Sequence, residues 1–312
     1  MLSVVIPAYN EEEMIARASD VIDGILNEAE ILHELIFVDD GSKDRTWAEI
    51  EQARLQHDSV RGVCFSRNFG KEAAIMAGLA AAKGDCCAVI DCDLQHPPEK
   101  IVEMYALWEE GVEVVEGQKS SRGNESAIHA FAAHCFYSLI SSATGFDMEN
   151  ASDFKLLDRK AVDVLVNMRE KNAFFRALSS WVGFKTGVVF FDVREREAGE
   201  SKWSTGALVR YAISNITSFS TLPMQIITVL GVVMFLVSCV FGGIALFQKV
   251  TGRALEGFTT VILILLFSSS VIMISLGIIG YYIACIYEEI KGRPRYIVAR
   301  TCGAELEEKT AC

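Results

Sequence analysis

Acidic side chains follow three short apolar runs near the start of the sequence. Glu11 comes shortly after the first run, Asp39 and Asp40 end the second, and Asp91 and Asp93 follow another. Like charges brought together repel one another unless a cation lies between them. Mg²⁺ and Mn²⁺ prefer carboxylate oxygens together with the oxygens of a substrate phosphate. The D-x-D spacing points both carboxylates to one side of an extended segment, so we predict that Asp91 and Asp93 hold Mg²⁺ or Mn²⁺.

The elements that position these acids follow from the hydrophobic pattern, in which apolar runs alternate with amphipathic stretches. The expected strands are Leu2–Ile6, Leu35–Val38, Val60–Phe65, Cys86–Ile90 and Val112–Val115. The expected helices are Glu11–Asn27, Asp44–Gln56, Lys71–Ala82 and Pro98–Glu109. This order predicts an α/β domain with a mostly parallel sheet flanked by helices. Ligands of such sheets bind beyond the carboxyl ends of the strands, where the acids lie.

Two long apolar stretches near the C-terminus predict transmembrane helices. Leu222–Phe247 and Phe258–Ile286 each exceed the roughly 20 residues that cross a bilayer. Basic residues are denser after the second stretch than in the short connection Gln248–Gly257. This bias predicts a multi-pass inner-membrane protein whose first domain and C-terminus are cytoplasmic. Two buried helices of a soluble protein are the alternative, but apolar runs of this length are rare in soluble cores.

Composition excludes several classes of protein. The formal net charge is −12, and residues 1–219 alone carry −13, which argues against nucleic acid as a partner. The nine cysteines form no C-x-x-C pair, so we expect a reducing compartment and neither a zinc site nor disulfides. The glycine-rich phosphate loops and the H-E-x-x-H zinc motif are absent from the sequence. P-loop, kinase and Rossmann dehydrogenase functions are therefore not expected.

Four segments together resemble a known enzyme family. VVIPAYNEEEMI, FVDDGSKDRT, FSRNFGKEAAIMAGL and AVIDCDLQHPPE are similar to the metal-dependent, inverting family 2 glycosyltransferases of GT-A fold. REAGESKWS, followed by two apolar stretches, resembles the polyprenyl-phosphate sugar transferases, the dolichyl-phosphate mannose synthase-like and bactoprenol glucosyltransferase group. The resemblance implies a GT-A domain over 1–203, a juxtamembrane amphipathic helix at the interface over 204–221, two transmembrane helices within 222–286 and a cytoplasmic tail over 287–312.

The resemblance also implies roles for individual residues. The residues expected to bind the nucleotide sugar are Pro7, Tyr9, Glu11, Asp39, Asp91 and Gln95. The residues expected to hold the metal ion are Asp91 and Asp93, and those expected to act in catalysis are Asp93, Asp153 and Arg122. The residues expected to contact the acceptor phosphate are Arg196, Lys202 and Lys155.

The residues themselves leave alternatives open for these roles. Arg196 and Lys202 lie just before an expected interfacial helix, where they could equally meet anionic lipids. Arg122 has the alternative of a solvated surface charge, and Asp153 that of a helix cap or turn residue. A phosphate monoester is already anionic at pH 7, so Asp153 is expected to orient substrates rather than to act as a strong base.

The activity implied by the resemblance is transfer of a hexose from a nucleotide sugar, expected to be a UDP-sugar, to polyprenyl phosphate at the cytoplasmic membrane face. A processive polysaccharide synthase is one alternative, although the Q-x-x-R-W motif of such synthases is absent from the sequence. A non-catalytic membrane-anchored scaffold of the same fold is another. Homo-oligomerisation stays open.

Overall fold

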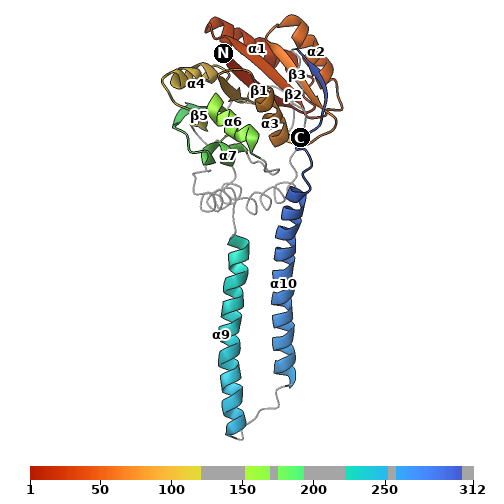
Figure 1. Ribbon diagram of the computed structural model, residues 1–312, viewed down its shortest axis with the longest axis vertical. Coiled ribbons are helices and arrows are strands. Elements are labelled where there is room, and N and C mark those ends of the chain that lie inside the picture. Colours follow the sequence, from red (N-terminus) through yellow and green to blue (C-terminus); the bar gives the residue numbers. More distant parts are fainter. Residues whose placement is uncertain (121–151, 169–174, 193–221, 252–257, 304–312) are drawn as a thin grey trace. The chain divides into compact units, whose positions relative to one another are not determined.

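The computed structural model describes residues 1–120, 152–168, 175–192, 222–251 and 258–303. The chain forms two compact units (Figure 1). The first comprises Met1–Arg210 together with Pro294–Cys312, and the second comprises Tyr211–Arg293.

The first unit contains an eight-stranded sheet in the order β7-β5-β6-β4-β1-β2-β3-β8. Its strands are β1 (Leu2–Ala8), β2 (His33–Asp39), β3 (Val60–Phe65), β4 (Cys86–Val89), β5 (Val114–Lys119), β6 (Lys155–Asp158), β7 (Thr186–Phe191) and β8 (Val298–Cys302). Strands β4, β1, β2 and β3 are parallel neighbours, whereas β6 is antiparallel to β4 and β5. The sheet is therefore mixed, with a parallel centre.

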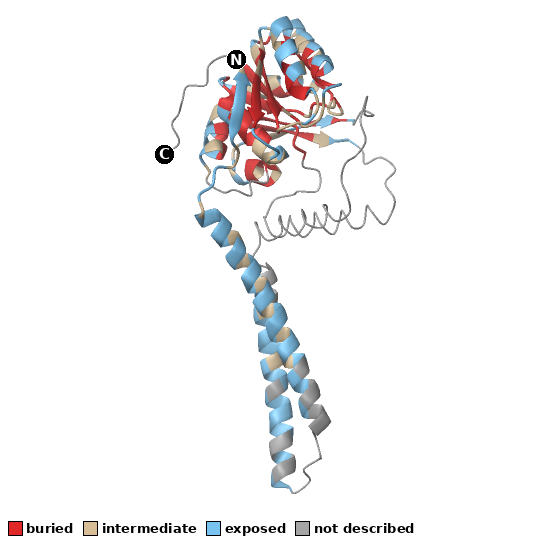
Figure 2. Cartoon of the chain, turned by 90° about the vertical axis from the view of Figure 1, so that its right-hand side faces the viewer, coloured by how far each residue is buried: buried red, intermediate tan, exposed pale blue. Residues whose placement is uncertain are grey.

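Helices flank this sheet. They are α1 (Ile15–Glu28), α2 (Thr46–Gln56), α3 (Lys71–Ala81), α4 (Lys100–Glu109), α6 (Arg159–Asn167) and α7 (Phe175–Trp181). The central strands are buried between them (Figure 2), and Val4, Val5 and Ile6 of β1 are all fully buried. Burial on both faces explains why these strands read as continuous apolar runs rather than as alternating patterns. The predicted α/β fold with a sheet flanked by helices is confirmed.

The strand directions place the predicted site residues at one edge of the sheet. Because β1, β2 and β4 are parallel, the loops that follow them leave from the same edge. Strand β6 runs in the opposite direction, so Asp153, two residues before β6 begins, lies at this edge as well. Gly41 lets the loops pack closely: its φ is +65°, and a Cβ there would lie 2.4 Å from the carbonyl carbon of Arg67.

The second unit contains two long apolar helices, α9 (Leu222–Val250) and α10 (Phe258–Ile290). The windows Ile227–Ile244 and Phe267–Ile290 are long and apolar enough to cross a membrane, with mean hydropathies of 2.5 and 2.0. Neither window is buried against other parts of the described chain. At about 1.5 Å per residue, each helix exceeds the roughly 30 Å hydrocarbon core of a bilayer.

The C-terminal segment adds a strand that the sequence analysis did not foresee. The sequence predicts a tail over residues 287–312, but Val298–Cys302 forms β8 and pairs antiparallel with β3. In the register of this pair, Thr301 lies opposite Val63 and Arg300 lies opposite Cys64. The chain therefore returns to the sheet of the first unit after α10.

Candidate active site

The loops after β1 and β2 are tied to one another by hydrogen bonds. The Asn10 amide donates to the Ser42 hydroxyl at 2.9 Å, and the Lys43 amide donates to Asn10 Oδ1 at 2.9 Å. The Glu11 amide donates to Thr46 Oγ1 at 2.9 Å. Asn10 has a φ of 53°, an uncommon conformation that these contacts hold in place. The segment that contains the predicted residues Pro7, Tyr9 and Glu11 is thereby fixed beside the end of β2.

Asp39 ends β2 and is almost fully buried. Its Oδ1 accepts a hydrogen bond from the Ser42 amide at 2.9 Å, and its Oδ2 accepts one from Cys64 Sγ at 3.3 Å. Burial and the neighbouring Asp39 carboxylate raise the pKa of the Cys64 thiol to about 12, so the thiol keeps its proton and can donate. These two contacts fix the orientation of Asp39 at the site edge.

Asp40 has a structural role that the sequence analysis did not separate from that of Asp39. Its carboxylate accepts hydrogen bonds from the backbone amides of Phe69, at 2.6 Å, and Gly70, at 2.9 Å. Gly70 has a φ of +101° and immediately precedes α3. Asp40 therefore holds the turn that begins α3, whose first residue is Lys71.

The segment that contains Asp91, Asp93 and Gln95 follows β4. The Gln95 amide donates to Asp93 Oδ1 at 3.1 Å across a turn in which Leu94 has a φ of 53°. The next residue, His96, stacks on the Phe154 ring with 5.2 Å between centroids. Burial lowers the pKa of His96, so its imidazole is neutral at pH 7. The stacked rings of His96 and Phe154 therefore support the turn that contains the D-x-D residues.

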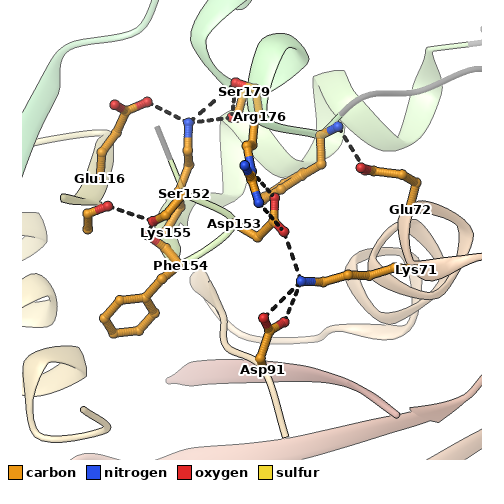
Figure 3. A network of polar contacts seen from close by, with 12 residues as sticks. Lys71, Glu72, Asp91, Glu116, Ser152, Asp153, Phe154, Lys155, Arg176 and Ser179 are labelled. Atoms are coloured by element: carbon orange, nitrogen blue, oxygen red, sulfur yellow. Dashed lines mark hydrogen bonds and ion pairs between the residues drawn. The ribbon is translucent and has the colours of Figure 1, made fainter. Parts of the chain in front are cut away.

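Lys71 lies between two of the predicted site carboxylates (Figure 3). Its amino group is 2.6 Å and 2.9 Å from the two oxygens of Asp91, and 2.8 Å from Asp153 Oδ2. Desolvation disfavours the charge on Lys71, but its contacts with Asp153 and Asp91 outweigh this effect and raise its pKa. Lys71 is therefore an ammonium that joins the end of β4 to the start of β6.

Arg176 of α7 holds Asp153 from the other side. Its Nε donates to Asp153 Oδ1 at 2.7 Å and its Nη2 donates to Oδ2 at 3.0 Å. Burial favours protonation of Asp153, but Lys71 and Arg176 outweigh burial and hold its pKa well below the usual range. Glu72 braces α7, because its carboxylate accepts a hydrogen bond from the Phe175 amide at 2.8 Å (Figure 3).

These contacts change the argument that the acids require a metal ion. Lys71 and Arg176 already neutralise Asp91 and Asp153, so charge repulsion alone does not demand a divalent cation. In the described part of the chain, no group of three or more His, Cys, Asp or Glu residues could hold one. Asp91 and Asp93 do supply two carboxylates, which is what Mg²⁺ commonly takes from a protein when substrate phosphates supply other ligands. The donor set therefore fits a metal ion that arrives with a diphosphate.

Lys155 is not placed to contact an acceptor phosphate. Its side chain is fully buried, and its amino group lies 2.5 Å from Glu116 Oε1 and 2.8 Å from Ser179 Oγ. Burial lowers the pKa of Lys155, while Glu116 opposes that shift. Because a buried ammonium with these partners cannot meet a ligand without breaking them, the acceptor-phosphate assignment of Lys155 is corrected to internal support for β5, β6 and α7.

The other predicted basic residues, Arg122, Arg196 and Lys202, lie outside the described residues. The first belongs to the segment that follows β5, and the other two to the segment that follows β7. Strands β5 and β7 are parallel to each other, and β5 is antiparallel to β6, so both strands end at the same edge as β4.

Sequence reasoning missed Lys71, Glu72 and Arg176. Lys71 and Glu72 lie within the segment FSRNFGKEAAIMAGL, which the family resemblance includes without assigning them a role. A signal was present, because a lysine at the first position of a helix is disfavoured by the helix dipole. No comparable signal marks Arg176, whose partner lies 23 residues away in the sequence.

The chain is similar to known glycosyltransferases over almost its whole length. The family described as glycosyl transferase family 2 matches residues 3–164. The uncharacterized glycosyltransferase YkcC of Bacillus subtilis is 39% identical over 97% of this chain and 94% of its own. The prophage bactoprenol glucosyl transferase homolog of Escherichia coli is 35% identical over 96% and 98%, and the bactoprenol glucosyl transferase of Shigella phage SfII gives the same values. Glucosyl-3-phosphoglycerate synthase from Mycobacterium tuberculosis, crystallised with Mn²⁺, UDP and glucosyl-3-phosphoglycerate, superposes with a TM-score of 0.49 at 24% identity, covering 70% of this chain and 79% of its own.

Proposed function

Because the chain belongs to glycosyl transferase family 2 and is a glycosyltransferase, we propose that it transfers a hexose from a nucleotide sugar, a UDP-sugar, to polyprenyl phosphate at the cytoplasmic face of a membrane. One observation carries the proposal. The similarity to bactoprenol glucosyl transferases extends over 96% of the chain, so it includes the two apolar helices as well as the sheet. A lipid acceptor accounts for a catalytic sheet attached to such helices.

The nucleotide is assigned to the loops after β1 and β2. Pro7, Tyr9 and Glu11 follow or end β1, and Asp39 lies beside them with both carboxylate oxygens already oriented by hydrogen bonds. A site whose polar groups are held before the ligand arrives loses less entropy on binding. Gln95, in the loop that follows β4, is assigned to the diphosphate.

Asp91 and Asp93 would hold Mg²⁺ or Mn²⁺ together with the diphosphate. When bound, the metal ion supplies Lewis-acid stabilisation of the charge that develops on the departing nucleotide. The two carboxylates belong to one segment, in which Leu94 has a positive φ and His96 stacks on Phe154. That stacking keeps the spacing of the ligands constant.

Asp153 orients the substrates rather than accepting a proton. Two cations hold its pKa below the usual range, so it is an anion that binds protons poorly. The attacking phosphate oxygen needs no base, since a phosphate monoester is already anionic at neutral pH. In-line attack by that oxygen on the anomeric carbon, with departure of the nucleoside diphosphate, inverts the configuration.

The acceptor phosphate is assigned to Arg196 and Lys202, and Arg122 keeps its proposed catalytic role. Helices α9 and α10 would span the inner membrane and keep the sheet at its cytoplasmic face. A charge-assisted contact of this kind stabilises a bound phosphate by about 1.5–3 kcal/mol. We therefore expect Lys202→Ala to raise the KM for polyprenyl phosphate and to leave the KM for the donor nearly unchanged.

The test is to incubate purified full-length protein with a panel of radiolabelled nucleotide sugars, polyprenyl phosphate and Mg²⁺ or Mn²⁺. The proposal expects label in a single lipid-soluble product with one sugar per lipid, in the anomeric configuration opposite to that of the donor. A growing polymer would instead indicate a processive synthase. Absence of turnover with every sugar would indicate a scaffold.

A further inference from the structure

Lys71 occupies the position of a counter-ion between two acids that come from different parts of the chain. Its three shortest polar contacts are with the two Asp91 oxygens and with Asp153 Oδ2, at 2.6, 2.9 and 2.8 Å. An ammonium has three N–H donors, so these three acceptors match its full capacity. Asp153 also has Arg176 as a partner, so its charge is compensated on two sides.

Helix stability does not explain a lysine at this position. Lys71 is the first residue of α3, where the positive end of the helix dipole disfavours a cation. Asp40 fixes the preceding turn through the amides of Phe69 and Gly70, which sets where Lys71 leaves the backbone. The ion pairs with Asp91 and Asp153 therefore offset an unfavourable interaction between the Lys71 ammonium and the helix dipole.

Both members of the Lys71–Asp91 pair are accessible to solvent and ions. The side chain of Lys71 is 40% exposed and that of Asp91 is 27% exposed, in contrast to 7% for Asp153. An ion arriving from solvent therefore reaches Asp91 before Asp153. A divalent ion at Asp91 and the Lys71 ammonium compete for the same two oxygens.

We propose that Lys71 is a positioning residue whose ammonium serves as an internal counter-ion for Asp91, which a divalent metal ion must displace while the ammonium keeps its contact with Asp153. This inference rests on the proposed function, in which Asp91 is a metal ligand. Its consequence is that the metal ion binds weakly alone, and that the diphosphate of the donor supplies the additional ligands that make displacement favourable. Metal and donor binding are then coupled through Lys71.

The test is Mn²⁺ binding by the purified full-length protein without nucleotide, measured from the electron paramagnetic resonance signal of free Mn²⁺. The variants are Lys71→Met, Asp91→Asn and the double variant, with Lys71→Gln as a second neutral replacement. Lys100→Met is a matched control, because Lys100 is also the first residue of a helix and also pairs with a carboxylate, that of Glu103. A residue that only supports the site would weaken Mn²⁺ binding when replaced, whereas a competing counter-ion would strengthen it.

We expect Lys71→Met and Lys71→Gln to bind Mn²⁺ about tenfold more tightly than the unmodified protein, since one charge-assisted contact no longer has to be broken. Lys100→Met should bind as the unmodified protein does. Asp91→Asn should weaken binding, and adding Lys71→Met to it should give no further change, because the competition has then lost its target.

Two different failures can be told apart. If Asp91→Asn weakens Mn²⁺ binding but both Lys71 variants bind equally or more weakly than the unmodified protein, the counter-ion inference is overturned and the metal assignment stands. Undetectable binding by all of the proteins, the Lys71 variants included, would also overturn the inference, and the metal dependence of transfer would then test the metal assignment by itself. If Asp91→Asn leaves Mn²⁺ binding unchanged, the metal assignment itself fails and the inference fails with it.

Discussion

Arg176 donates from two guanidinium nitrogens to the two carboxylate oxygens of Asp153, at 2.7 and 3.0 Å. The two residues come from different elements, α7 and the segment before β6. A planar fork of this kind fixes the rotation of the carboxylate as well as its position. The orientation of Asp153 at the site edge is therefore set by α7.

Replacing Arg176 by lysine is expected to lower kcat about tenfold while the KM for the nucleotide sugar changes little. An ammonium keeps the charge but cannot reproduce the fork, so Asp153 gains rotational freedom. Steady-state kinetics with both substrates varied measure the effect. Arg54→Lys is the matched control, because Arg54 of α2 pairs with Asp58, which lies just before β3 at the opposite edge of the sheet from the site. A higher KM for the nucleotide sugar with an unchanged kcat would contradict an orienting role for Arg176.

The buried pair of Lys155 and Glu116 gives a prediction about stability. Lys155→Met should lower the free energy of unfolding by about 3–5 kcal/mol, because it leaves the Glu116 carboxylate buried without its partner. Adding Glu116→Gln should recover much of the loss. Thermal unfolding of the three proteins in detergent measures this. A raised KM for polyprenyl phosphate with unchanged stability would contradict the internal role of Lys155.

Glu72 predicts a pH dependence of stability. Burial and the nearby Asp153 raise its pKa from 4.5 to about 7, so the folded state holds this proton more tightly than the unfolded state. Its contribution to stability is complete below the unfolded pKa and is lost as the pH rises through about 7. Glu72→Gln keeps an acceptor for the Phe175 amide but cannot ionise. Its thermal midpoint should therefore fall less than that of the unmodified protein between about pH 5 and about pH 8.

The control for this prediction is Glu103→Gln, which removes an exposed carboxylate paired with Lys100. It should keep the pH dependence of the unmodified protein. Parallel curves for Glu72→Gln and the unmodified protein would show that Glu72 does not titrate in this range.

Pairing of β8 with β3 predicts the membrane topology. Since β8 belongs to the same unit as the sheet, α9 and α10 should cross the membrane as a hairpin with both ends on one side, which is the cytoplasmic side under the proposed function. Single cysteines replacing Thr251 and Thr301 in a cysteine-depleted background test this. Thr251→Cys should react with an impermeant reagent on intact cells, and Thr301→Cys only after permeabilisation. Labelling of Thr301→Cys from outside would contradict the hairpin.

The parallel centre of the fold could be predicted from the sequence, because its strands are buried on both faces. β1, β2, β3 and β4 appear as apolar runs, and the predicted helices α1 to α4 agree with the structure to within a few residues. β6 and β8 have no such signal. The first is only four residues long, and the second, VARTC, is largely exposed and pairs with a strand more than two hundred residues earlier.

The candidate site could be predicted where its residues follow strands and not where partners are distant. The sequence predicted that Asp39, Asp91 and Asp93 lie at one edge of the sheet, because parallel strands end together, and the pairing of β1, β2 and β4 confirms that placement. Lys71 was missed because its partner Asp153 is 82 residues away, and Lys155 was misassigned because a fully buried lysine is rare. Both errors concern where a charge lies, which local sequence does not determine.

The dependence of transfer on the D-x-D carboxylates is tested by comparing the unmodified protein with Asp93→Asn and the matched surface variant Asp58→Asn. Asp58 is fully exposed and lies just before the start of β3, at the edge of the sheet opposite the site. The measurement is metal-dependent transfer of radiolabelled hexose from the nucleotide sugar to polyprenyl phosphate by folded, membrane-inserted protein. We expect chelation of divalent metal to stop transfer, Asp93→Asn to abolish it, and Asp58→Asn to leave it unchanged. Near-normal transfer by Asp93→Asn, with the same metal requirement, would contradict the account.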